Sequence, residues 1–367
     1  MGHVTDFVKE RISTDKLTLA NYVSTENMKS DFGGINPAIS IPNNTNVIHY
    51  KKGDVLLSNI RPYLRKVWAA NSDGGCSTDV FVFRAKSISP SFLHYIMAND
   101  TFINYVMSGA KGVKMPRGDK EQMLKYVFSI PRIEEQYKIS RLLHLLDDRI
   151  ATQNKIIEKY ESLIQAICDT LIESGQPKVE LSFNDFGEPY SGLSGKSAED
   201  FGKGWPYITY MNVYQNQIID ITDVGLVKIN ETEQQSVVRY GDILFTLSSE
   251  TPDEVGMGAV YLGDIYPLYL NSFCFGVHIT DESKIYPPFL AYYISTKSFR
   301  KAVFPLAQGS TRFNLQKSDF MKKKFLFPTV EEQNKIYSVL KAYSDKLSIE
   351  KNIANLLCEQ KSEAVSK

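Results

Sequence analysis

The sequence IPRIEEQYKI at residues 130–139 recurs as FPTVEEQNKI at residues 327–336, a displacement of 197 positions. The same displacement relates Phe102 to Phe299, so the match continues upstream of the motif. A shared P-x-x-E-E-Q-x-K-I pattern is too long to arise by chance. The chain therefore contains an internal repeat, and this repeat determines how the whole fold is interpreted.

Upstream of the motif the two copies match only in short stretches. Residues 53–56 (GDVL) match residues 241–244 (GDIL) with a displacement of 188, and Tyr22 matches Tyr207 with a displacement of 185. The residues between these stretches diverge almost completely. This pattern indicates a shared scaffold that carries unlike surface loops.

The first copy is shorter at its start. If the displacement of 185 continues to the N-terminus, Gly2 aligns with Gly187 and the equivalents of residues 177–186 are missing. We therefore expect the first copy to lack a first strand such as residues 179–183. The alternatives are that the sequence begins late or that the C-terminal segment completes the first domain.

Each copy has a longer and a shorter part. The longer part mixes β-rich runs, such as residues 80–83, with helical stretches, such as residues 90–107. The shorter part begins after a proline and has two glutamates in its first turn, where the helix dipole favours them. The predicted fold class is α+β, with globular α/β domains at residues 1–133 and 177–328 and long helices at residues 134–176 and 329–367.

The apolar residues of the two long segments recur in alternating steps of four and three, which is the seam of a coiled coil. They are Leu143, Leu146, Ile150, Ile157, Tyr160, Ile164, Ile167 and Leu171 in the first segment, and Ile336, Leu340, Tyr343, Leu347, Ala354 and Leu357 in the second. Gln153 and Glu350 break the seams at equivalent positions. We predict an antiparallel coiled coil in which the Gln153 amide donates to the Glu350 carboxylate and fixes the register.

The composition is that of an ordinary globular protein, with 43% hydrophobic and 23% charged residues. The 42 basic and 42 acidic residues balance, which excludes a uniformly basic coat, although residues 1–133 hold 17 Lys and Arg against 11 Asp and Glu. No apolar run reaches the roughly 18 residues of a membrane span, and the N-terminus lacks a signal-peptide pattern. We expect a cytoplasmic protein, without a metal site or disulfides among its four dispersed cysteines.

This layout resembles the DNA-specificity subunit of a type I restriction-modification system, and the resemblance covers essentially the whole chain. The resemblance rests on the two P-x-x-E-E-Q-x-K-I helix starts, together with the sequences of residues 190–196, 207–213 and 309–315. The resemblance implies that the globular parts are target-recognition domains, each reading one half of a split site in double-stranded DNA, and that the helices hold them apart.

The resemblance also implies a non-catalytic subunit with partners. It implies two methyltransferase (modification) subunits, docked on the helices, and restriction/translocase subunits. S-adenosylmethionine, ATP and Mg²⁺ are expected in those partners and no cofactor in this chain. The competing hypothesis is a structural coiled-coil adaptor that binds proteins without reading DNA.

The hypothesis that the chain is itself an enzyme is not supported by a catalytic motif in the sequence. The Pro-Pro of residues 286–289 lacks the leading Asn or Asp that an adenine methyltransferase loop requires. Residues 191–197 resemble a phosphate-binding loop, but Tyr190 stands where its first glycine belongs. No histidine has a partner at catalytic spacing, so we assign no catalytic residue.

Candidate DNA-reading side chains lie in loops, because base edges and phosphates are reached from there. The glycine-rich loop at residues 111–118 aligns with residues 308–314, and two further clusters follow the repeated Gly-Asp turns. The candidates are Asn59, Arg61, Arg65, Lys111, Lys114 and Arg117 in the first domain, and Lys196, Thr246, Ser248, Ser249, Gln308, Thr311, Arg312 and Asn314 in the second. The alternative for these loops is a solvated surface, and the bases read cannot be derived from residue types.

Overall fold

The computed structural model describes residues 1–174 and 177–366. It divides into two compact units, Met1–Asn154 with Ile353–Lys367, and Lys155–Asn352. Each unit contains one globular domain and parts of the two long helices α4 (Ile133–Ser174) and α9 (Val330–Ser366). Among the described helices, none is both long enough and apolar enough to cross a bilayer.

The domain of the first unit is built on an antiparallel sheet with the strand order β1-β8-β5-β6, and three helices cover one face of it. The strands are β1 (Thr5–Phe7), β5 (Val55–Ser58), β6 (Val67–Ala69) and β8 (Val80–Ala85), and the helices are α1 (Pro90–Met97), α2 (Asp100–Ser108) and α3 (Lys120–Leu124). A second sheet has the order β2-β4-β7-β3, with β2 (Arg11–Ser13), β3 (Tyr22–Val23), β4 (Asn46–Tyr50) and β7 (Gly74–Cys76).

The central strand β5 is buried on both faces, which explains its uninterrupted apolar sequence. Val55 and Leu57 pack into the cluster beneath the helices, whereas Leu56 packs into the cluster that includes Tyr50 of the second sheet. Successive side chains of a strand point to opposite faces. The main sheet is therefore the middle layer of the domain.

The domain of the second unit repeats this architecture. Its main sheet has the equivalent order β10-β17-β13-β15. The elements are β10 (Gly187–Ser191), β13 (Ile243–Thr246), β15 (Gly258–Val260) and β17 (Cys274–Ile279), with α6 (Pro287–Tyr293), α7 (Lys297–Val303) and α8 (Lys317–Lys322). The second sheet contains β12 (Val224–Val227), β11 (Phe201–Ile208) and β16 (Tyr269–Leu270), and α5 (Tyr210–Gln215) follows β11. The predicted duplicated α+β fold with two long helices is confirmed.

Strand register corrects the predicted alignment of the N-terminal residues. Thr5 pairs with Ala85, and Gly187 pairs with Ile279, the structural equivalent of Ala85. Gly187 therefore corresponds to Thr5 and not to Gly2 as predicted. The reason is packing: Met1 and Val4 take the core positions that Phe183 and Phe186 take in the second unit, three residues apart in both cases.

The second unit has an additional antiparallel pair, β9 (Lys178–Leu181) with β20 (Phe325–Pro328). Residues 128–131, which match β20 in sequence, form no strand in the first unit. The expectation that the first copy lacks a strand such as residues 179–183 stays a prediction.

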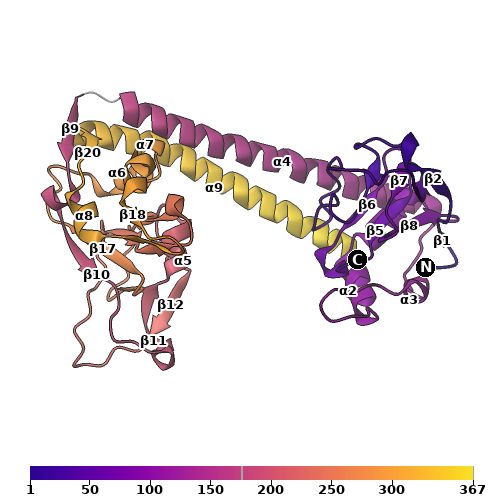
Figure 1. The fold of residues 1–367 in the computed structure, drawn as a ribbon, viewed down its shortest axis with the longest axis horizontal. Helices are drawn as coiled ribbons and strands as arrows, with labels where there is room; N and C mark the ends of the chain where they lie inside the picture. Colours follow the sequence, from indigo (N-terminus) through magenta and orange to yellow (C-terminus); the bar gives the residue numbers. More distant parts are fainter. Residues whose placement is uncertain (175–176, 367) are drawn as a thin grey trace. The chain divides into compact units, whose positions relative to one another are not determined.

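The long helices run antiparallel within the second unit. The pairing of Lys178 with Pro328 brings the end of α4 next to the start of α9, as Figure 1 shows beside β9 and β20. Farther along, Glu161 of α4 forms an ion pair with Lys351 of α9 at 2.7 Å. In the first unit, Asp147 of α4 pairs with Lys361 of α9 at 2.5 Å.

The predicted seam needs one correction, in the last turns of α4. There Cys168 and Ile172 are buried in the core of the second domain, whereas the predicted Ile167 and Leu171 are only half-buried. In these turns the face of α4 that carries residues 164, 168 and 172 points toward the second domain, because the phenylalanine-rich core of that domain lies there. Gln153 is buried, as a seam position requires; its pairing with Glu350 stays a prediction.

The glutamine of the repeated motif attaches each long helix to its domain. The buried Gln136 accepts from the backbone N–H of Ser89, the residue preceding α1, at 2.8 Å and donates to the Pro131 carbonyl at 2.9 Å. Gln333 makes the equivalent bonds to Tyr286 and Pro328, at 2.8 and 2.9 Å. The repeat in sequence is thus a repeat of one buried contact.

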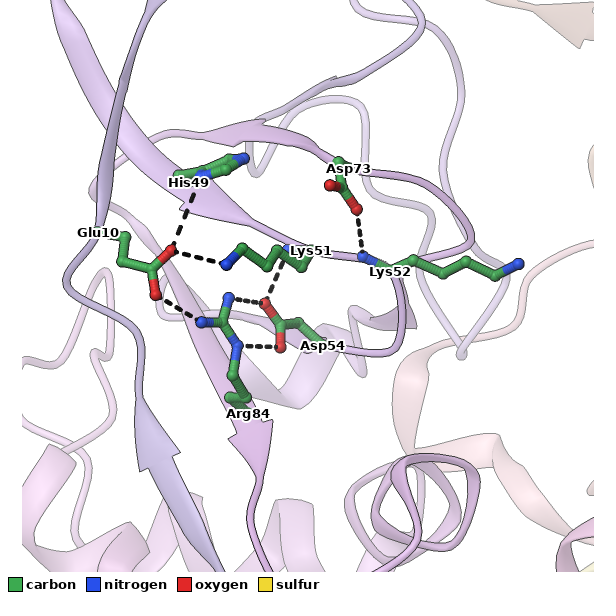
Figure 2. Close-up of polar contacts among 7 residues, drawn as sticks. All are labelled: Glu10, His49, Lys51, Lys52, Asp54, Asp73 and Arg84. Carbon is green, nitrogen blue, oxygen red and sulfur yellow. Dashed lines mark hydrogen bonds and ion pairs between the residues drawn. The ribbon is translucent and has the colours of Figure 1, made fainter.

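The Gly-Asp turns form a second repeated contact, and Figure 2 shows the one in the first unit. Asp54 accepts from the Lys51 backbone N–H at 2.8 Å and receives two bonds from the Arg84 guanidinium, at 2.9 and 2.7 Å. Arg84 also pairs with Glu10 at 2.7 Å and lowers the pKa of that carboxyl. Burial of the Asp54 carboxylate costs free energy. This cost is offset only when the carboxylate is paired with a cation and its remaining hydrogen bonds are satisfied.

The second unit keeps the aspartate and changes its partners. Asp242 accepts from the Arg239 backbone N–H at 2.8 Å, as Asp54 does from Lys51. Its other bonds are to the Tyr190 hydroxyl at 2.8 Å and the His278 Nδ1 at 2.9 Å. The turn is thus a property of the scaffold, whereas the side chains that bond the aspartate vary.

Replacement of Arg84 by Ala should destabilise the first unit by about 3–5 kcal/mol, because it leaves the Asp54 carboxylate, 3% exposed, without its cation. Lys86→Ala is the matched control, since Lys86 pairs with Asp6 at the exposed surface and its loss should cost less than about 1 kcal/mol. Urea unfolding can be followed through Trp68 fluorescence with Trp205 replaced by Phe in every variant. Equal losses for the two variants would show that the Asp54 pair is not a structural anchor.

Candidate nucleic-acid interface

Three short strands of the second unit bring two of the sequence-predicted clusters together. They are β14 (Ser248–Ser249), β19 (Phe313–Leu315) and β18 (Ala307–Gln308). Ser248 pairs with Asn314, and Asn314 pairs with Gln308. The sequence predicted each cluster separately, and the structure places them in one small sheet.

The first unit contains the same arrangement in reduced form. Ile60 pairs with Arg117, and Arg117 pairs with Lys111, each as an isolated antiparallel bridge. These positions are the equivalents of Ser248, Asn314 and Gln308. The glycine loop and the stretch after β5 are therefore adjacent in both domains.

The turn between the two outer strands depends on glycine. Gly309 has a φ of +135°, and a Cβ at this position would lie 2.1 Å from the Arg312 carbonyl oxygen. Gly112 is its equivalent in the first unit, with a φ of +98°. Only glycine adopts such a conformation without strain, so the turn itself is fixed while the neighbouring side chains vary.

In the second unit the sheet presents polar side chains to solvent. Gln308 and Asn314 stand opposite each other, so their amide groups share one face, and both are exposed. The next residue, Leu315, is buried in the core and anchors the strand. Thr311 and Arg312 are exposed in the turn. Amide and guanidinium groups of this kind can bind adenine and guanine edges.

In the first unit the equivalent face is cationic. Lys111 and Arg117 replace Gln308 and Asn314, and each pairs with a carboxylate: Lys111 with Asp119 at 3.0 Å, Arg117 with Asp79 at 3.4 Å. Exposed ion pairs contribute little to stability, about 0–1 kcal/mol, so phosphate groups can compete for these cations. Lys114 is exposed at the tip of the loop.

Asn59, Arg61 and Arg65 surround this loop but differ in their availability. Arg61 is exposed, and its backbone N–H donates to the Pro116 carbonyl at 2.9 Å, which joins it to the glycine loop. Arg65 pairs with Asp31 and Asp100, at 3.1 and 2.8 Å. Asn59 is buried beneath the loop. Arg61 is thus exposed, whereas the Arg65 side chain, 43% exposed, is already paired with two carboxylates.

Four candidates of the second unit lie below the surface. Thr246, Ser248 and Ser249 are buried, and the Ser249 hydroxyl donates to Glu254 at 3.2 Å. The Lys196 side chain is 4% exposed and forms an ion pair with Glu233. DNA contact stays a prediction for all four, and each already contributes to the packing of its own domain.

Two residues outside the list of predicted candidates support the site. The hydroxyl of Tyr210 donates to the Ser248 carbonyl at 2.7 Å, which holds α5 against β14. Arg300, whose burial lowers its pKa, donates to the backbone carbonyls of Asp253, Val255 and Gly256. No sequence motif marks these contacts, because they join side chains to backbone groups of distant loops.

Two further features concern chemistry at the site. Within the described ranges, no group of three or more His, Cys, Asp or Glu side chains is arranged to hold a metal ion. All four cysteines are free thiols, and Cys76, Cys168 and Cys274 are buried. Burial raises the pKa of these three thiols to about 12.

Comparison with known proteins gives one family. The model of the type I restriction modification DNA specificity domain matches residues 9–162 and again residues 191–359. Two matches of one domain model agree with the two copies in the fold.

Two curated relatives carry related names. The chain is 30% identical over 119 residues to the type I restriction enzyme EcoDI specificity subunit of Escherichia coli, covering 31% of this chain and 27% of that protein. It is 23% identical over 294 residues to the MjaVIII specificity subunit of Methanocaldococcus jannaschii, covering 74% of this chain and 65% of that protein. The chain thus aligns with less than two thirds of the length of either relative.

Solved structures share the fold over the whole chain. One, described under complex assembly and conformational transition of the type I R-M system, has a TM-score of 0.61 at 19% identity and covers 100% of this chain and 95% of that chain. The S subunit of a type I system from M. genitalium has a TM-score of 0.54 at 16% identity, with 100% and 96% covered.

The two glycine loops should respond differently to truncation. Arg312→Ala should cost about 1–3 kcal/mol of sequence-specific DNA binding if Arg312 reads a guanine, because one bidentate base contact is lost. Lys114→Ala should weaken all sequences alike and reduce the salt slope by about one, because it removes one phosphate contact. Fluorescence anisotropy at several salt concentrations measures both. Unchanged affinity and unchanged salt slope in both variants would show that the loops are ordinary solvated surface and do not contact DNA.

Proposed function

We propose, from the premise that the chain belongs to the family of type I restriction modification DNA specificity domains, that it reads double-stranded DNA and has no catalytic residue of its own. The observation that carries this proposal is one backbone site present twice with different side chains: Lys111 and Arg117 in one domain, Gln308 and Asn314 in the other. A conserved frame with exchanged polar groups is what two readers of different sequences require.

Each domain would read one half of a split site. The cationic face of the first domain suits guanine and phosphate, and the amide face of the second suits adenine. The glycine loops of the two domains carry different side chains, while the main sheets keep the same strand order. Specificity can therefore change in one domain without disturbing the other.

The two long helices would set the gap between the half-sites and dock the partners. Leu142 of α4 is 55% exposed, and its equivalent in the other helix, Val339, is 43% exposed. We place one docking site on each helix at this repeated position, and the expectation of two methyltransferase subunits comes from the family resemblance. Restriction/translocase subunits would join through these.

Chemistry would belong to the partner subunits, which would carry S-adenosylmethionine, ATP and Mg²⁺. The substrate of such a complex is the cell's own and invading DNA, so the proposal includes a cytoplasmic location. The comparisons give no support to the alternative of a structural adaptor that binds proteins only.

Replacement of residues 177–328 by the matching domain of a relative should change one half of the methylated motif. The other half and the gap should stay the same, because the first domain and both helices are untouched. Sequencing of methylated adenines in cells that carry the chimera and its methyltransferase subunit provides the measurement. A change in both halves would contradict the assignment of one half-site to each domain.

Insertion of four residues into each helix, after Gln153 and after Glu350, should lengthen the gap by one or two base pairs. Four residues add about 6 Å to a helix and roughly preserve its face, and one base pair occupies about 3.4 Å. A seven-residue insertion keeps the seam in phase but adds about three base pairs and roughly 100° of DNA rotation, so activity should fall. An active four-residue variant that still methylates the parental spacing would rule out helix length as the ruler.

A further inference from the structure

The first unit contains a cavity of about 540 Å³ that plays no part in the proposed DNA contacts. It lies between the edge strand β6, the helix α1 and the first turns of α4. Val67, Trp68 and Ala69 line it from the strand, His94 from α1 and Ser140 from α4. The cavity is therefore continuous with the free edge of the main sheet.

The outward edge of β6 carries unpaired backbone groups. Ala70 exchanges hydrogen bonds with Gly53 and Asp54 on the β5 side, so by strand alternation the N–H and C=O of Ala69 point away from the sheet. Within the first unit, whose globular residues are all described, no backbone hydrogen bond reaches Ala69 from that side. An edge of this kind accepts an added strand.

The second unit shows such a strand in place. Val260, the equivalent of Ala69, donates to the Gln217 carbonyl at 2.9 Å and accepts from the Ile219 N–H at 3.0 Å. Ile218 pairs with Val260 in parallel orientation. The segment 217–219 therefore covers the edge of β15, and the Ile218 side chain packs against the large apolar core.

The first unit has the same loop, and its Phe32 lines the cavity and packs against the core, but among the described residues no residue of this loop pairs with Ala69 as Ile218 pairs with Val260. Equivalent hydrogen bonds anchor the two loops. The side-chain amide of Asn27 donates to the Asn36 carbonyl, and that of Asn212 donates to the Asp220 carbonyl. Counting back from these anchors, Gly34 stands where Ile218 stands. A Cβ at Gly34 would have only Trp68 within 4 Å, at 3.9 Å, so this position opens onto free space.

The spacer helix adds a second difference. Tyr337 of α9 packs against Tyr286 and Tyr292 of its own domain, with ring centroids at 5.5 and 6.0 Å. Its equivalent in α4 is the smaller Ser140, which lines the cavity. His94 replaces Ala291 and refills part of the volume, but the opening remains.

The wall of the cavity has polar groups to offer. The Nδ1 of His94 is buried and has no hydrogen-bond partner among the described residues, and burial lowers its pKa to about 4. Asp147 is occupied by the Tyr95 hydroxyl at 2.9 Å and by Lys361. Arg141, which lines the cavity, is exposed. Arg141 is therefore the cation of the cavity lining with which a carboxylate on the occupant can pair.

We propose that this cavity and the β6 edge bind an extended segment of a partner polypeptide, which adds a strand beside Ala69 and inserts an aliphatic side chain toward His94. The second unit supplies the template for the occupant, since its own segment 217–219 does the same for β15. An acidic residue two positions after the aliphatic one, as Asp220 follows Ile218, would pair with Arg141. This binding site is independent of DNA reading.

The probe for this site is a synthetic peptide with the sequence of residues 214–222, YQNQIIDIT. Full-length protein with Trp205→Phe reports binding through Trp68, its remaining tryptophan. We expect saturable binding. The same peptide with proline at the position of Ile219 should bind at least about tenfold more weakly, because the N–H that donates to the edge strand is lost.

Ser140→Tyr should weaken peptide binding by about tenfold or more, because it places the side chain of the second unit in the cavity. Ser162→Tyr, on an exposed turn of the same helix, is the matched control and should bind as the parent does. The proline peptide tests the unaltered protein, so the comparison holds even if the Ser140 variant folds poorly. Absence of binding at millimolar peptide, or equal binding of both peptides, would overturn the proposal.

Discussion

A buried glutamine side chain at the start of each long helix is the contact on which the rest of the structure depends. Gln136 and Gln333 use both ends of the amide, one on the residue before the first domain helix and one on the proline turn that precedes the spacer helix. Unpaired, either amide end would cost about 1–3 kcal/mol in a buried site. In each domain, two hydrogen bonds of one glutamine side chain therefore fix the direction in which the long helix leaves the domain.

The rest of each domain separates what is fixed from what varies. The Gly-Asp turn keeps its aspartate, which caps the same backbone turn in both copies, while its side-chain partners are Arg84 in one and Tyr190 with His278 in the other. The glycine loops follow the same rule, with a fixed turn and exchanged side chains. A scaffold of this kind can change its surface chemistry at little cost to its fold.

The repeat in the sequence was sufficient to predict the fold, because the P-x-x-E-E-Q motif carries a contact that leaves little choice of local structure. It failed where two packings satisfy the same pattern: the last turns of α4 present Cys168 and Ile172 to the domain core instead of Ile167 and Leu171. The N-terminal alignment failed for a related reason, since Met1 and Val4 are unlike the phenylalanines whose places they take.

The candidate site was predictable in position and only partly in detail. Glycine and basic residues mark an exposed turn, so Lys114 and Arg312 lie at the surface as expected. Burial of Thr246 and the ion pair of Lys196 with Glu233 depend on residues about 30 or more positions away, which no local pattern reveals. The same holds for the cavity beside β6, which is recognisable only by comparing two copies in three dimensions.

The most direct test of the central claim is to sequence the methylated adenines of a cell that carries this chain together with its methyltransferase subunit. Two domains that read DNA from fixed helix ends should produce a split motif of two short half-sites with one constant gap. Methylation that depends on this chain but shows a single continuous motif, a variable gap or no motif would contradict the account.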